Sequence, residues 1–113
     1  MIVDLLTWIQ NWYYKHCDGD WEHEYGVKID TLDNPGWAVD IDLVDTDLES
    51  ASFERIEVER SEQDWVHCSV QEQIFRGRGG PKNLEDILEI FRQWASRTEN
   101  ARDHNKEGLT RQG

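Results

Sequence analysis

Apolar residues near the start of the chain recur at intervals of three and four positions, which is the period of a helix with one buried face. This spacing predicts an amphipathic helix over residues 3–17, with Asp4 near its start and Gly19 after its end. Its apolar stripe consists of Leu5, Leu6, Ile9, Trp12, Tyr13 and His16. Trp8 lies at the edge of the stripe, so the period alone leaves its burial open.

The pattern then changes to alternation of apolar and polar residues, which predicts β-strands over residues 22–32 and 37–44. One face of this pair is apolar and consists of Trp21, His23, Tyr25, Val27 and Ile29, followed by Trp37, Val39, Ile41 and Leu43. Pro35 and Gly36 interrupt the alternation with a fixed and a permissive backbone, which predicts a turn. The segment is therefore a predicted hairpin with Asp40 and Asp42 on its other face.

Two more strands are predicted, over residues 53–60 and 65–75, after a polar loop at residues 45–52. Phe53 is out of phase with its strand, which indicates a bulge or a later start. The glycine-rich residues 76–81 are predicted to be a loop.

A second helix is predicted over residues 83–97, with Asn83 as its N-cap. Its apolar stripe consists of Leu84, Ile87, Leu88, Phe91, Trp94 and Ala95. Residues 98–113 are polar and predict a flexible tail, which leaves one domain over residues 1–97.

These elements predict an α+β fold with an N-terminal helix, a four-stranded, mainly antiparallel meander and a C-terminal helix. Both helices are expected on one face of the sheet, which leaves the other face open to solvent or to a partner. The strand alternation places on that open face Asp40, Asp42, Glu57 and Glu59, together with Trp65 or His67. A register error of one residue would invert this assignment.

The chain is strongly acidic, with 24 Asp and Glu against 12 Lys and Arg and a net charge of −12 over 113 residues. Such a charge disfavours nucleic acid and anionic membranes as partners and favours a basic protein, although acidity also serves solubility. The acids are clustered between positions 40 and 64. The expected partner-binding residues are Asp40, Asp42, Asp45, Asp47 and Glu49.

The two cysteines, Cys17 and Cys68, are too few for a disulfide framework. We find no signal-peptide pattern and no apolar stretch near 18 residues, so a cytoplasmic location is expected.

A small metal-dependent or Cys-dependent enzyme is an alternative, because two His-Cys pairs could converge. Its candidate residues are His16, Cys17, His23, His67 and Cys68. Adjacent residues of a strand point to opposite faces, however, so His67 and Cys68 are poorly placed to share one metal. Buried cysteines and ordinary histidines are the simpler interpretation, and no metal or cofactor is expected.

Two other chemical interpretations are weaker. The glycine-rich segment before the last helix lacks the Lys-Ser/Thr that ends a phosphate-binding loop. Glu22 and Asp33 could form a catalytic carboxylate pair, but each is more simply a hydrogen-bond acceptor that stabilises a turn.

Two short motifs resemble those of the immunity protein 53 family. The first is Trp21-Glu22, and the second is Asp33-Asn34-Pro35-Gly36-Trp37. The resemblance covers the chain from the first helix to about Trp94. It implies a non-enzymatic protein that binds and neutralises a cognate toxin of a bacterial polymorphic toxin system, with the motif residues in structural roles. A generic acidic adaptor for protein binding is the remaining alternative.

Overall fold

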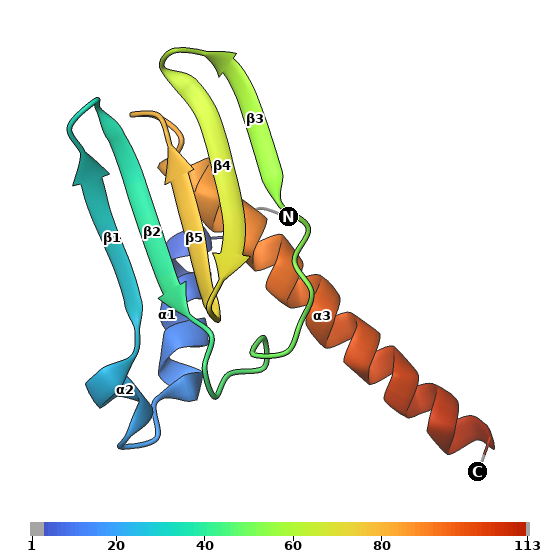
Figure 1. The fold of residues 1–113 in the computed structure, drawn as a ribbon. Coiled ribbons are helices and arrows are strands. Elements are labelled where there is room, and N and C mark those ends of the chain that lie inside the picture. Colours follow the sequence, from blue (N-terminus) through green and yellow to red (C-terminus); the bar gives the residue numbers. More distant parts are fainter. Residues whose placement is uncertain (1–3, 113) are drawn as a thin grey trace.

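The computed structural model describes residues 4–112 and shows a five-stranded sheet with two helices packed on one of its faces (Figure 1). The elements in chain order are α1 (Leu5–His16), α2 (Trp21–Glu24), β1 (Val27–Leu32), β2 (Gly36–Asp42), β3 (Ile56–Ser61), β4 (Asp64–Gln71), β5 (Ile74–Gly79) and α3 (Leu84–Gln112). The predicted α+β class is confirmed, with one helix before the strands in the chain and one after them. Residue 3, where the first helix was predicted to begin, and residue 113 lie outside the described residues.

The sheet is entirely antiparallel, in the order β1-β2-β5-β4-β3. The predicted four-stranded meander is therefore wrong in strand number and in order. The last strand, β5, returns to the middle of the sheet and pairs with both β2 and β4. This arrangement joins the hairpin β1–β2 to the β3–β4 hairpin through a strand that the sequence analysis assigned partly to a loop.

The predicted strand at residues 65–75 is in fact two strands, β4 and β5, joined by a tight turn. Glu72 and Gln73 form this turn with φ of 53° and 61°, between the paired residues Gln71 and Ile74. Two-residue turns with positive φ at both positions usually contain Asn-Gly or a related pair. Glu72-Gln73 does not match that pattern, so the turn could not be recognised from the sequence.

Glycine in β5 serves close packing rather than flexibility. A Cβ placed at Gly77 would collide with Cγ2 of Ile87, and one at Gly79 would come within 3.1 Å of Ile87 Cδ1. Helix α3 therefore approaches β5 closely because the strand has no side chains at these positions. The prediction of a loop at residues 76–81 is wrong up to Gly79 for this reason.

The segment before β1 is also different from the prediction. Residues 21–24 form the short helix α2 rather than the start of a strand, and β1 begins at Val27. Asp18 Oδ1 accepts a hydrogen bond from the Trp21 amide at 2.9 Å, which stabilises the turn that leads into α2. A side chain bound to the backbone in this way favours a turn over an extended strand.

Helix α3 continues to Gln112, past the predicted end near Arg97. A helix that has already formed by packing its apolar stripe can extend through polar residues at little cost, because propagation is easier than nucleation. The last turns of α3 extend away from the sheet (Figure 1). That residues 98–113 are flexible stays a prediction. Among the described residues, no helix is long and apolar enough to cross a lipid bilayer.

The core lies between the sheet and the helices and is rich in aromatic rings. Phe91 of α3 is at its centre, with ring centroids 5.0 Å from Phe75, 5.1 Å from Trp12 and 5.9 Å from Trp8. Trp8 is half-buried, which settles the position that the helix period left open. Edge-to-face contacts of this kind add to the stabilisation from buried area.

The loop between β2 and β3 is polar in sequence but is held firmly in place. Its Leu43 and Leu48 are fully buried. The indole of Trp21 donates to the Val44 carbonyl at 2.8 Å, and the indole of Trp94 donates to the Ser52 carbonyl at 2.8 Å. The loop therefore packs against both α2 and α3.

Candidate functional site: the open sheet face and the acidic loop

The face of the sheet that points away from the helices carries charged and polar side chains. The pairing register places Glu57 opposite His67 and Glu59 opposite Trp65, while Asp40 lies opposite Arg76. Alternate residues of the same strands, including Val39, Ile41, Val66 and Cys68, are buried against the helices. The predicted open-face residues are therefore on that face, and both Trp65 and His67 lie there.

Arg76 and Arg78 of β5, which were predicted to lie in a loop, also lie on this face. Arg76 and Arg78 alternate with Phe75, Gly77 and Gly79, which point to the helices. The alternation in Ile74–Gly79 was visible in the sequence. It was overlooked because glycine at every second position was taken as an indication of a loop.

Arg78 and Asp40 form an ion pair on the open face. Arg78 Nη1 donates to Asp40 Oδ1 at 2.9 Å and to the Gly77 carbonyl at 2.9 Å. Both side chains remain about a third exposed, at 32% and 36%. The charge of Asp40 is therefore largely balanced within the protein.

A cavity of about 240 Å³ opens on this face around the two arginines. Its lining residues are Arg55, His67, Cys68, Ser69, Gln71, Arg76 and Arg78. Arg55 forms an ion pair with Glu57, and Gln71 Nε2 donates to Ser69 Oγ at 3.3 Å. Arg76 Nε is buried and has no hydrogen-bond acceptor among the described residues.

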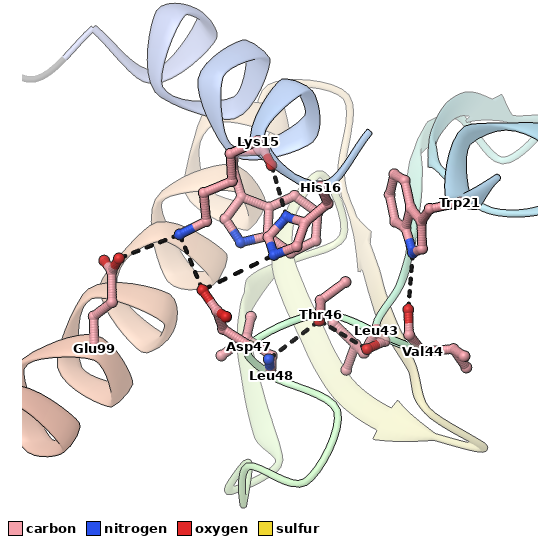
Figure 2. A network of polar contacts seen from close by, with 10 residues as sticks. Lys15, His16, Trp21, Leu43, Val44, Thr46, Asp47, Leu48 and Glu99 are labelled. Carbon is pink, nitrogen blue, oxygen red and sulfur yellow. Dashed lines mark hydrogen bonds and ion pairs between the residues drawn. The ribbon is translucent and has the colours of Figure 1, made fainter. Parts of the chain in front are cut away.

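The loop between β2 and β3 carries the other predicted acids, Asp45, Asp47 and Glu49. Asp47 Oδ2 lies 3.0 Å from Lys15 Nζ of α1 and 3.9 Å from His16 Nε2 (Figure 2). Lys15 Nζ also lies 3.2 Å from Glu99 Oε1 of α3. Partial burial lowers the pKa of Lys15, but the hydrogen bonds with Asp47 and Glu99 outweigh it and raise the pKa. We call the loop segment of residues 45–49 the acidic loop.

The five acids expected to bind a partner thus fall on two surfaces. Asp40 and Asp42 lie on the open sheet face, where Asp42 Oδ2 accepts the Gly26 amide at 2.9 Å. The other three belong to the acidic loop, beside α1 and α3. The side chains of Asp45 and Glu49 make no hydrogen bond or ion pair within the described part of the chain; Asp45 is exposed and Glu49 is half-buried.

The two sequence motifs lie at opposite ends of β1. Glu22 accepts hydrogen bonds from the Asp18 and Gly19 amides at 3.0 and 2.9 Å. Hydrogen bonds from backbone amides lower the pKa of the Glu22 carboxyl; the amide of Glu22 itself contributes most, and those of Asp18 and Gly19 contribute less. Asp33 is exposed in the turn after β1, so the structure does not bring the two carboxylates together as a catalytic pair. The indole of Trp37 donates to the Pro81 carbonyl at 3.0 Å, which ties the hairpin to the segment before α3.

The histidines and cysteines of the enzyme alternative are dispersed. Cys68 is buried on the helix side of β4, and this burial raises the pKa of its thiol to about 12, whereas His67 is on the open face. His16 Nδ1 lies 2.8 Å from the Trp12 carbonyl, and Cys17 Sγ donates to the Tyr13 carbonyl at 3.3 Å. In the part of the chain that the structure describes, no group of three or more His, Cys, Asp or Glu could hold a metal ion.

Comparison with known proteins identifies one family. The model of the family described as immunity protein 53 matches residues 6–96. No curated protein and no solved structure matches the chain at a significant level. The matched residues extend from α1 through all five strands into α3, so they include the open sheet face and the acidic loop.

Proposed function

The chain belongs to the immunity protein 53 family, and from this membership we propose that it binds and neutralises a cognate toxin domain of a bacterial polymorphic toxin system. Binding occludes the toxin, and the chain itself catalyses no reaction. The site of action is the cytoplasm of the producing cell. The match over residues 6–96 is the observation that carries this proposal, since it covers the two-layer domain.

The charge of the chain supports a basic toxin as the partner. With a net charge of −12, the protein attracts positively charged surfaces over a distance comparable to the Debye length, roughly 10 Å at 0.1 M salt. Asp45 and Glu49 in the acidic loop have no internal partner among the described residues. Such groups speed association, and electrostatically steered complexes reach on-rates of roughly 10⁸–10⁹ M⁻¹s⁻¹.

The open sheet face supports a more specific contact than charge alone. The described helices lie on the opposite face (Figure 1), and Trp65 is half-buried on the open face, with its ring centroid 5.2 Å from that of His67. Tryptophan and arginine are the residue types that most often carry the binding energy of protein interfaces. We therefore expect the toxin to contact the open face through Trp65 and the arginines, while the acidic loop steers its approach.

Co-expression with the toxin encoded beside this chain tests the proposal. The toxin should arrest growth by itself, and the chain should restore growth and copurify with the toxin as a stable complex. A chain that restores growth without forming a complex would contradict occlusion, because it would have to act on the toxin or on its product catalytically. A neighbouring product that is harmless, or that does not bind, would instead favour the adaptor hypothesis.

A further inference from the structure

Arg76 is unusual among the arginines of this acidic chain. Other arginines pair with a carboxylate: Arg55 with Glu57, Arg60 with Asp64, Arg78 with Asp40 and Arg92 with Glu89. Within the described side chains, only Arg76 and Arg97 lack such a partner, and Arg97 is exposed to water. Arg76 is half-buried and its Nε is fully buried without an acceptor. A guanidinium in this state has an unmet capacity to donate hydrogen bonds.

The surroundings of Arg76 favour an anion. It lies in the central strand β5, opposite Asp40 on one side and Ser69 on the other. Asp40 is the carboxylate residue paired with Arg76 across the sheet, but the Asp40 side chain accepts its hydrogen bond from Arg78. Among the residues that the structure describes, no carboxylate lines the cavity, whose polar groups come from arginine, histidine, serine and glutamine. The cavity is thus a cationic, donor-rich hollow in an otherwise acidic protein.

We infer that this cavity receives the carboxylate of an Asp or Glu side chain of the toxin, held by the guanidinium of Arg76. The inference rests on the proposed function and names the chemistry of the contact. The planar fork of arginine matches the two oxygens of a carboxylate. A volume of about 240 Å³ suits one side chain and is smaller than the usual pocket for a small-molecule ligand, roughly 300–1,000 Å³.

A carboxylate on a basic protein suits this site better than a nucleic-acid phosphate. The net charge of −12 repels a polyanion before it reaches the cavity. A toxin with a basic surface is attracted as a whole and can then insert a single acidic side chain. The acidic surface and the arginine cavity therefore have complementary tasks, since the first speeds the encounter and the second fixes the orientation.

Binding kinetics with the cognate toxin test this inference through two variants of equal charge change. Arg76→Gln should raise Kd at least tenfold, mainly through faster dissociation. Arg97→Gln removes the same positive charge from an exposed site on α3, so its Kd should stay the same or fall slightly. Arg76→Lys should also raise Kd relative to the wild type, because lysine keeps the positive charge but lacks the planar fork. Thermal unfolding of each variant checks that the fold is retained.

The partner carboxylate is located by replacing each toxin Asp and Glu with its amide. One toxin variant should bind the wild-type chain with a higher Kd. The same toxin variant should bind Arg76→Gln with no further increase in Kd, because the two substitutions remove the same contact. Equal Kd for Arg76→Gln and the wild type, or a loss that couples to no toxin carboxylate, would overturn the inference while leaving the proposed function intact. A wild-type chain that does not bind the toxin at all would overturn the proposed function itself.

A measurement without the toxin distinguishes a carboxylate ligand of the cavity from a phosphate ligand. Acetate and inorganic phosphate are titrated into the free, folded chain while the Nε–H resonances of arginine are followed by NMR. Acetate should shift the Arg76 resonance and leave that of Arg97 in place, and the shift should be lost in Arg76→Gln. A response to phosphate without a response to acetate would indicate a phosphate ligand and contradict the inference.

Discussion

The two faces of the sheet are made by the same strands, yet they differ in almost every physical respect. The covered face consists of fully buried apolar side chains such as Val39, Ile41 and Phe75, with Gly77 where α3 approaches most closely. The open face carries ion pairs, a half-buried tryptophan and a cationic cavity. Because neighbouring residues of a strand point to opposite faces, stability and recognition can be assigned to alternate positions of one short segment.

Strand β5 shows this division most clearly. Phe75, Gly77 and Gly79 serve the packing of α3, while Arg76 and Arg78 serve the open face. A substitution on the covered side should therefore act on the free energy of unfolding, and one on the open side should act on binding. The first two of the following predictions test that separation, and the third tests the turn that leads into β5.

Adding volume on the covered side should have the largest effect. Gly77→Val places a branched side chain against Ile87, where even a Cβ collides, and should lower the free energy of unfolding by about 3 kcal/mol. The matched control is Ala38→Val, which adds apolar volume on the open face of β2 and should change the free energy of unfolding by less than about 0.5 kcal/mol. Urea denaturation measures both. Equal destabilisation by the two variants would show that the faces do not divide these tasks.

Removing charge should affect association and spare the fold. Replacing Asp40, Asp42, Asp45 and Asp47 by Asn should slow association with the toxin about tenfold at low salt and flatten its salt dependence. The matched control replaces four exposed acids elsewhere by Gln, namely Glu24, Glu62, Glu72 and Glu85. Stopped-flow mixing over a range of salt concentrations measures the rates.

The control variant has the same net charge as the test variant, so a smaller loss of on-rate would localise the effect. If both variants slow association equally, overall charge decides the rate and these four positions have no special role. If neither does, the open face and the acidic loop do not steer the toxin.

Improving the β4–β5 turn should have the smallest effect. Replacing Glu72-Gln73 by Asn-Gly supplies residues suited to φ of 53° and 61°, and should raise the free energy of unfolding by about 1 kcal/mol. The turn lies at the end of the sheet (Figure 1), and thermal unfolding measures the gain in the free energy of unfolding. A loss of stability would show that Glu72 or Gln73 makes contacts that outweigh the backbone preference.

Two hairpins, β1–β2 and β4–β5, show where sequence reasoning succeeded and where it failed. The β1–β2 hairpin has clear alternation and a Pro-Gly turn, and the structure confirms it between Val27 and Asp42. The β4–β5 hairpin has an atypical turn and glycines that serve packing, so its second strand was taken for a loop. The residues of β5 that matter most for the proposed site, Arg76 and Arg78, were therefore placed in a loop and not on a face of the sheet.

The sequence by itself determined the α+β class, the face that each side chain takes within β1 to β4, and the start of α3 directly after Asn83. These follow from the local period of apolar residues, which depends on residues a few positions apart. Only the tertiary structure decided that β5 lies between β2 and β4, that the predicted acids divide between two surfaces, and that Arg76 borders a cationic cavity. Local periodicity cannot specify these features, because they depend on which distant segments pack together and on how closely a helix approaches a strand.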